Sequence, residues 1–221
     1  SETEQEEVES RLSAEGYLPV PLSAEEVESY YEGFCNSTIW PLFSYFTQYP
    51  VYRRSLWESY VSVNERFCDV VLKVAREDDV IWVHDFQLML LPELLREHMP
   101  DTAMGFFLHI PFPSFEVFRL LPWRRRILKG MLGADLVGFH TYHYAQHFLE
   151  SVSQLLGYEH RLRQIISDER VVRVGAFPMG IDYERFSSAV NDPAVRREVR
   201  KVRRHVGDRK TILSLDRMDY T

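Results

Sequence analysis

The chain alternates between short apolar segments and longer amphipathic ones, and this alternation constrains its fold more than any other feature. Runs rich in apolar and β-branched residues, typical of strands buried on both faces, fall at 80–83, 104–108, 136–139, 171–174 and 211–215. Segments typical of helices lie between them, at 56–74, 88–98, 115–132 and 141–156. Strands that alternate with helices predict an α/β fold with a doubly wound parallel sheet.

Composition is consistent with a packed protein and excludes several classes of partner. Of the 221 residues, 45% are hydrophobic and 14% aromatic, enough to bury a substantial core. A formal net charge of -7 argues against general attraction to nucleic acid or to an anionic membrane. No apolar stretch reaches the ~18 residues that a membrane-spanning helix needs. Only Cys35 and Cys68 are present, too few for a disulfide framework. We therefore expect a soluble, cytoplasmic protein.

The region 175–180 favours a boundary between domains. It contains two glycines and a proline, and a more charged segment follows it. We predict one domain over 1–180, and a linker with the first strand of a second domain over 181–221. The last predicted strand, 211–215, lies close to the final residue and lacks the crossover that a parallel partner would require. We therefore expect the sequence to be a piece of a longer protein.

Polar side chains follow the predicted strands at their carboxyl ends. They are His84 and Asp85, His109, His140 with Thr141, and Asp216 with Arg217. In an open parallel sheet, ligands bind beyond these strand ends, where the loops converge. A single Asp or His there is more often a helix cap or a solvated loop residue, but four such positions weaken that interpretation. Pro111 and Pro113 hold the loop after His109 in an extended conformation, which suits ligand contact.

The segment 30–43 combines aromatic residues with Gly33, Asn36, Ser37 and Pro41, which is a poor fit to a continuous core helix. Aromatic rings together with amide groups suit sugars. The alternative is that its aromatic side chains only cover the core under a loop. Composition alone favours the alternative.

Several segments together resemble the trehalose-6-phosphate synthase family, and they occur in the same order as in that family. They are residues 30–34, 40–43, 82–88, 105–113, 132–141, 177–182 and 216–221. The resemblance extends from about Gly16 to the last residue. It implies two Rossmann-like domains facing across a cleft, the GT-B arrangement, of which this chain holds most of the N-terminal, acceptor-binding one.

The resemblance also implies an activity. Members of the family transfer glucose from a nucleotide sugar such as UDP-glucose to glucose 6-phosphate, with retention at the anomeric carbon, and produce trehalose 6-phosphate. By position, Tyr31, Trp40 and Asp85 resemble the residues that hold glucose 6-phosphate. His109 resembles the histidine beside the transferring glucose, and Arg217 the arginine on the donor diphosphate. Asp85, His109 and Arg217 are thus the expected catalytic residues, without a protein nucleophile.

A metal-independent mechanism without a cofactor is what the family implies, and no Asp-x-Asp motif is present. His143 and His147 are four residues apart on a predicted helix, but no third ligand is identifiable, so an exposed helix face is the better interpretation. The expected partners are the nucleotide-glucose and the sugar phosphate, and a homo-oligomer is possible.

The sequence also departs from the family. No glycine-rich strand with a phosphate-binding arginine precedes Gly16, Ser44 replaces a histidine that many relatives have, and His143 replaces an aspartate. We expect this piece to be inactive alone. Two alternatives stay open: a glucosylglycerol-phosphate synthase, which uses glycerol 3-phosphate as acceptor, and a non-catalytic relative that senses sugar phosphates.

Overall fold

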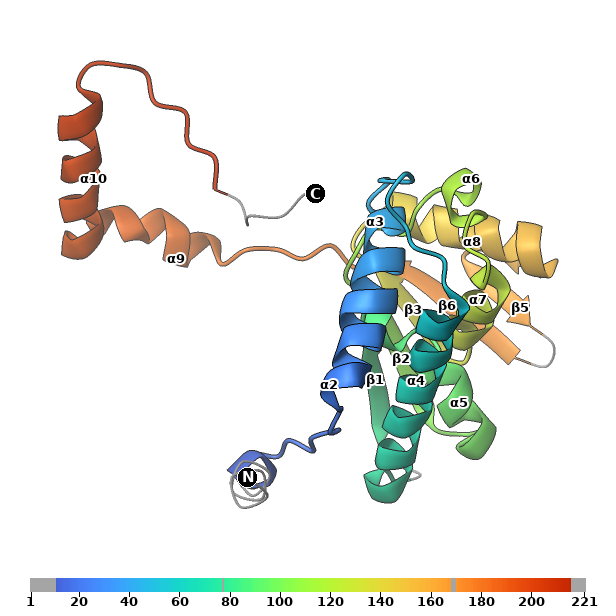
Figure 1. Cartoon of the computed structure of the whole chain (residues 1–221). Coiled ribbons are helices and arrows are strands. Elements are labelled where there is room, and N and C mark those ends of the chain that lie inside the picture. The colour runs from blue at the N-terminus through green and yellow to red at the C-terminus, as the bar shows by residue number, and fades with distance from the viewer. Residues whose placement is uncertain (1–10, 77, 168–169, 216–221) are drawn as a thin grey trace. The chain divides into compact units, whose positions relative to one another are not determined.

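A computed structural model describes residues 11–76, 78–167 and 170–215. Its elements are, in chain order, α2 (Ala24–Glu26), η1 (Val27–Ile39), α3 (Trp40–Phe43), α4 (Arg54–Val74), β1 (Val80–His84), η2 (Phe86–Leu88), α5 (Leu91–His98), β2 (Ala103–Leu108), α6 (Phe115–Phe118), α7 (Arg124–Leu132), β3 (Leu136–Phe139), α8 (Tyr142–Leu156), β4 (His160–Arg161), β5 (Gln164–Ser167), β6 (Arg170–Ala176), α9 (Tyr183–Ser188), η3 (Ala189–Asn191) and α10 (Pro193–Val206). Figure 1 labels most of these elements along the chain.

The six strands form one sheet in the order β1-β2-β3-β6-β5-β4. β1, β2, β3 and β6 are parallel, and β5 and β4 continue the sheet in antiparallel fashion. The predicted α/β fold with a Rossmann-like, mostly parallel sheet is confirmed. The four parallel strands coincide with the apolar runs at 80–83, 104–108, 136–139 and 171–174 to within two residues at each end.

The hairpin of β4 and β5 was not predicted. Its turn is made by Leu162 and Arg163, both with positive φ, at 51° and 62°. Two positive φ values in a two-residue turn are the geometry that usually selects Asn-Gly or Asp-Gly. Because neither residue is a turn-former, the sequence carried no signal for this hairpin.

Among the described residues the helices cover one face of the sheet, and on the other face Phe107 is buried but most side chains are exposed, so the expected burial of the strands on both faces is not seen in this piece of the protein. Side chains on the buried face form the core with the helices, and they are Val83, Met104, Phe106, Leu108, Val137, Phe139, Val172 and Val174. On the other face, Val80 is 76%, Trp82 65% and Val171 52% exposed. Because side chains of a strand alternate between faces, this pattern fixes which strand-end residues share a side.

Segment 30–43 is a continuous helix, so the expectation that it would not form one is wrong. η1 has the wider hydrogen bonding of a π-helix, with the Trp40 amide donating to the Cys35 carbonyl, and it runs directly into α3. Phe34 is fully buried with its ring centroid 4.5 Å from that of Tyr60 on α4. Gly33 permits this approach, since a Cβ there would lie 2.8 Å from Leu56 Cδ2. Packing against α4 thus outweighs the low helix propensity of the segment.

Two other predicted helices are interrupted. The segment 88–98 begins with the 3-10 turn η2 before α5, and 115–132 divides into α6 and α7 on either side of Pro122. α4 and α8 match their predicted helices, and Thr141 caps α8 by accepting a hydrogen bond from the Tyr144 amide. None of the helices in the described ranges combines the length and the apolarity needed to cross a membrane.

The chain divides into two compact units, one reaching Pro178 and the other beginning at Met179. The second unit contains α9, η3 and α10, none of which has a buried residue. Residues 211–215 do not form a strand within this piece of the protein, and the predicted first strand of a second domain stays a prediction. A strand needs a hydrogen-bonded neighbour, and the described part of the second unit offers only helices and connecting segments.

Candidate functional site

Three neighbouring parallel strands bring polar side chains to one edge of the sheet. β1 ends at His84 and is followed by Asp85, β2 is followed by His109, and β3 by His140. The ladder places His84 opposite Phe107 and Leu108 opposite Phe139. The carboxyl ends of the three strands are therefore level, as the ligand-binding edge of an open α/β sheet requires.

Asp85 joins the ends of β1 and β2. Its amide donates to the Phe107 carbonyl at 2.8 Å, and its Oδ1 accepts from the amides of Phe86 at 2.9 Å and His109 at 3.1 Å. Its backbone has φ 69° and ψ 173°, a conformation that is rare for any residue except glycine. The described residues donate no hydrogen bond to Oδ2, so this oxygen is available to accept one from a ligand hydroxyl.

Three imidazoles lie side by side across the strand ends. Nδ1 of His84 is 2.9 Å from Nε2 of His109, at hydrogen-bonding distance. The ring of His140 meets that of His109 edge-on, with centroids 5.5 Å apart. Partial burial lowers the pKa of His84, and the neighbouring His109 lowers it further, whereas Asp85 opposes the change. The lowered pKa favours the neutral ring of His84, whose Nδ1 can either donate or accept one hydrogen bond.

Trp40 lies next to this edge, but Tyr31 is not connected to it. The Trp40 ring contacts that of Phe86, the residue after Asp85, with centroids 5.9 Å apart. Tyr31 is 44% exposed on η1, and no described contact joins it to Asp85 or His109. The structure therefore joins Asp85 to His109 and places Trp40 beside Phe86, whereas the predicted role of Tyr31 stays a prediction. Arg217 lies outside the described residues, so its place in the site stays a prediction.

The loop after Asp85 is held by side chains that the sequence analysis did not identify. Tyr60 on α4 donates its hydroxyl proton to the Phe86 carbonyl at 2.8 Å and accepts from the Met89 amide at 3.0 Å. Burial raises the pKa of Tyr60 well above its usual value, which keeps the hydroxyl as a donor. Asn64, one turn further on, donates to the Gln87 carbonyl at 3.1 Å. The signal for this network was a buried Asn within the apolar face of a helix.

The histidine pair on α8 does not resemble a metal site. His143 is exposed, and Nδ1 of His147 lies 3.1 Å from the Phe112 carbonyl, which makes that nitrogen a donor. The described part of the chain contains no group of three or more His, Cys, Asp or Glu side chains able to hold a metal ion.

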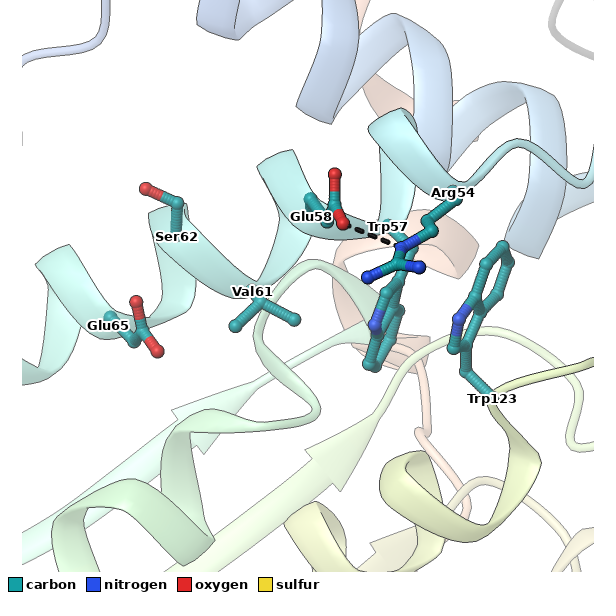
Figure 2. A pocket seen from close by; sticks show the side chains of 7 residues that line it. All are labelled: Arg54, Trp57, Glu58, Val61, Ser62, Glu65 and Trp123. Atoms are coloured by element: carbon teal, nitrogen blue, oxygen red, sulfur yellow. Dashed lines mark hydrogen bonds and ion pairs between the residues drawn. The ribbon is translucent and has the colours of Figure 1, made fainter.

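A separate open pocket of about 530 Å³ lies along α4 and is shown in Figure 2. The indoles of Trp57 and Trp123 stack in it with centroids 5.2 Å apart and an angle of 8°. At its rim Arg54 pairs with Glu58 at 2.8 Å. None of the predicted site residues lines this pocket, and the strand-end cluster remains the better candidate site.

Comparisons with known proteins agree with the fold and with the motifs. The model of the family described as "Glycosyltransferase family 20" matches residues 1–221. The bifunctional trehalose-6-phosphate synthase/phosphatase of Thermoproteus tenax is 49% identical over 223 residues, which cover 100% of this chain and 30% of that protein.

Two solved structures resemble the chain in space. The α,α-trehalose-phosphate synthase (UDP-forming) from Burkholderia vietnamiensis has a TM-score of 0.84 at 32% identity, covering 90% of this chain and 45% of that one. The enzyme of the same name from Burkholderia xenovorans, in complex with glucose-6-phosphate, has a TM-score of 0.75 at 30% identity, covering 84% and 42%. This chain thus spans less than half the length of these relatives. Because the family model covers its whole length, the chain belongs to glycosyltransferase family 20.

Proposed function

We propose that this chain is part of a retaining glucosyltransferase that moves glucose from UDP-glucose, or another nucleotide-glucose, to glucose 6-phosphate and forms trehalose 6-phosphate. Membership of glycosyltransferase family 20 supports this proposal, as do relatives whose names describe UDP-forming trehalose-phosphate synthases. The resemblance to a solved synthase in complex with glucose-6-phosphate supports the choice of acceptor.

The observation that carries the proposal is the pairing of Asp85 with His109 at the ends of two adjacent parallel strands. Oδ2 of Asp85 accepts a hydrogen bond from a hydroxyl of the acceptor sugar, and His109 orients a hydroxyl of the transferring glucose. Trp40 and Tyr31 contribute to the wall for glucose 6-phosphate, since aromatic rings pack well against the apolar face of a sugar. These roles are the ones that the resemblance assigns, and the hydrogen bond from the His109 backbone amide to Asp85 Oδ1 supports them by holding the two residues next to each other.

The chemistry breaks the bond between the anomeric carbon and the diphosphate oxygen, and forms one to the acceptor hydroxyl oxygen. That hydroxyl attacks on the face from which the diphosphate departs and passes its proton to the leaving oxygen. Negative charge develops on the diphosphate, and Arg217 stabilises it. A hydrogen bond to a charged group contributes ~1.5–3 kcal/mol, so loss of Arg217 slows transfer at least about tenfold.

The test uses the complete gene product that contains this chain. We expect it to form trehalose 6-phosphate from UDP-glucose and glucose 6-phosphate, with chromatography and NMR identifying the product. Asp85→Asn removes the negative charge of the carboxylate but keeps the size of the side chain. It should lower kcat/KM for glucose 6-phosphate at least about tenfold. Asp69→Asn on the exposed side of α4 is the matched control and should leave transfer unchanged.

Other outcomes would replace the proposal. Faster transfer to glycerol 3-phosphate than to glucose 6-phosphate would identify a glucosylglycerol-phosphate synthase. Binding of glucose 6-phosphate without transfer from any nucleotide-glucose would identify a sensor of sugar phosphates.

We also propose that the reaction needs no metal ion and takes place in the cytoplasm. A reducing compartment fits the two buried cysteines, both of which are free thiols. Transfer should therefore continue unchanged in excess EDTA, and a loss of activity that Mg²⁺ or Mn²⁺ restores would contradict the proposal.

A further inference from the structure

His84 ends β1 next to Asp85, but neither the residue pattern nor the resemblance gives it a role. Its side chain lies on the face of the sheet opposite to the core, as does that of Trp82 two residues earlier. The ladder places His84 opposite Phe107, two residues before His109. His84 and His109 therefore project from neighbouring strands on one side, and their rings lie 5.2 Å apart with an angle of 27°.

We propose that His84 is a positioning residue, which fixes the tautomer and the ring orientation of His109 through the hydrogen bond between Nδ1 of His84 and Nε2 of His109. The inference rests on the proposed function only in assigning His109 to the transferring glucose. With Nε2 engaged by His84, the nitrogen of His109 that remains for a ligand is Nδ1.

The 2.9 Å separation couples the tautomers of the two rings. Two N–H groups facing each other would repel, and so would two lone pairs, so one facing nitrogen carries a proton and the other does not. Whichever nitrogen holds that proton, the protonation of Nδ1 of His109 is determined with it. This nitrogen is then either a fixed donor or a fixed acceptor, and a sugar hydroxyl meets one defined partner.

Neighbouring rings hold the pair in place. Trp82 packs on His84 with centroids 4.4 Å apart, and Phe107 packs on His109 at 4.7 Å. His140 closes the other side of His109 and also meets Phe107 edge-on at 5.0 Å. Because both side chains are held in this way, they lose little entropy when the hydrogen bond forms. The bond can therefore keep the His109 ring oriented before the substrate arrives.

The charges around the pair are compatible with a single shared proton. The titratable groups that face it are Asp85 after β1, His109 after β2 and His140 after β3. Partial burial, followed by the closeness of His109, lowers the pKa of His84, which favours its neutral ring. Two imidazolium ions at this distance would repel strongly.

Histidine-labelled NMR of this chain tests the coupling without any activity. Two-bond correlations between ring protons and ¹⁵N report the tautomer, and we expect one tautomer of His109 at neutral pH. His84→Phe keeps a ring against Trp82 but removes the nitrogen, and His109 should then give averaged shifts of a mixture. His84→Asn, whose amide group occupies the place of Nδ1, should restore one tautomer. His160→Phe, at an exposed strand position away from the cluster, is the matched control and should change nothing.

Kinetics of the complete gene product supply the second measurement. His84→Phe should lower kcat about tenfold with little change in KM for glucose 6-phosphate, because His109 faces the donor glucose rather than the acceptor. It should also alter the pH profile of kcat, and His84→Asn should recover most of the rate. If the role of His84 were purely structural, His84→Phe would lower the midpoint of unfolding, but it would not lower kcat selectively while leaving KM unchanged.

The results separate failure of this inference from failure of the proposed function. A single His109 tautomer that is unchanged in His84→Phe overturns the inference, even if transfer is confirmed. Absence of transfer in the unsubstituted protein overturns the proposed function, whereas the NMR result still decides on His84. If His84→Phe does not fold, failure of the folded His84→Asn variant to keep one His109 tautomer overturns the inference.

Discussion

At the scale of single residues, Asp85 illustrates how this site combines backbone strain with chemistry. A non-glycine residue at φ 69° and ψ 173° persists only where its surroundings hold it. Here the surroundings are the ladder bond to Phe107, the two amides on Oδ1, and the loop that Tyr60 and Asn64 fix from α4. The strain places the carboxylate between two strand ends, a position that relaxed strand geometry would not give it.

A pair of substitutions at Asp85 separates strain from the loss of the carboxylate. Both Asp85→Gly and Asp85→Ala remove the two hydrogen bonds of Oδ1, but only glycine adopts this backbone conformation without strain. Asp85→Gly should therefore unfold with a free energy ~1–3 kcal/mol higher than that of Asp85→Ala. Urea unfolding followed by circular dichroism measures the difference. Equal stability of the two variants would show that the conformation costs nothing.

At the scale of elements, close contacts between backbones fix how the helices lie on the sheet. α7 approaches α5 through Gly130 and Gly133, whose missing side chains leave room for the chain at Met89–Leu90 and Pro92–Glu93. At the opposite end of the sheet from the site, Asp135 accepts from Arg96, Arg170 and the Met104 amide, and so links α5, β2, β3 and β6. The Asp135 contacts thus act directly on strands of the sheet that carries the site.

Gly130→Ala should destabilise the protein although alanine is the better helix former. A Cβ at this position would lie 2.8 Å from Leu90 Cα and closer still to the Met89 carbonyl oxygen, and neither backbone atom can move aside easily. Overpacking of this kind typically costs ~1–3 kcal/mol, above the ~1 kcal/mol gained in helix propensity. Gly180→Ala, where no atom lies within 4 Å of the added Cβ, is the matched control. Thermal unfolding of both variants tests this.

Acid should release the contact at Asp135. Although partial burial raises the pKa of Asp135, the Met104 amide and the guanidinium groups of Arg170 and Arg96 outweigh this effect and lower it below its ordinary 3.8. A lowered folded pKa means that Asp135 stabilises the fold fully above the ordinary value, and that this stabilisation disappears as pH falls through the folded value.

Asp135→Asn should therefore be less stable than the parent near neutral pH, and the difference should shrink on acidification. Urea unfolding at several pH values measures it, with Asp101→Asn, an exposed aspartate, as control. A difference that stays constant down to strong acid would mean that the ion pairs contribute no stability.

At the scale of the whole molecule, the sequence predicts secondary structure best where a segment is an uninterrupted run of apolar residues. The four parallel strands could be predicted because each is a short apolar run, and the placement of Asp85 and His109 at one edge followed from the rule that parallel strands end at the same edge. The role of His84 could not be predicted, because only the register opposite Phe107 shows that its ring meets His109. The η1 helix and the Leu162–Arg163 turn could not be predicted, because tertiary packing and backbone conformation, not local propensity, determine them.

Limited proteolysis should distinguish the two units. Helices α9 and α10 have no buried residue, and α10 contains several arginines, whereas the unit ending at Pro178 has an extended core. Trypsin should cut first after Arg185 and within α10, and mass spectrometry should find the region from α4 to β6 intact. Equally fast cleavage within α4 would contradict this expectation.

The one-sided burial of the sheet makes Trp82 an intrinsic fluorescent reporter. Of the four tryptophans, Trp57 is only 9% exposed, whereas Trp82 is 65% exposed and lies against His84. In this piece of the protein its indole is therefore exposed to water, where a quencher such as iodide can reach it and the charge on the adjacent imidazole can alter its emission. A ligand or protein segment that binds on that side of the sheet and covers Trp82 will shift its emission to shorter wavelength and protect the indole from quenching.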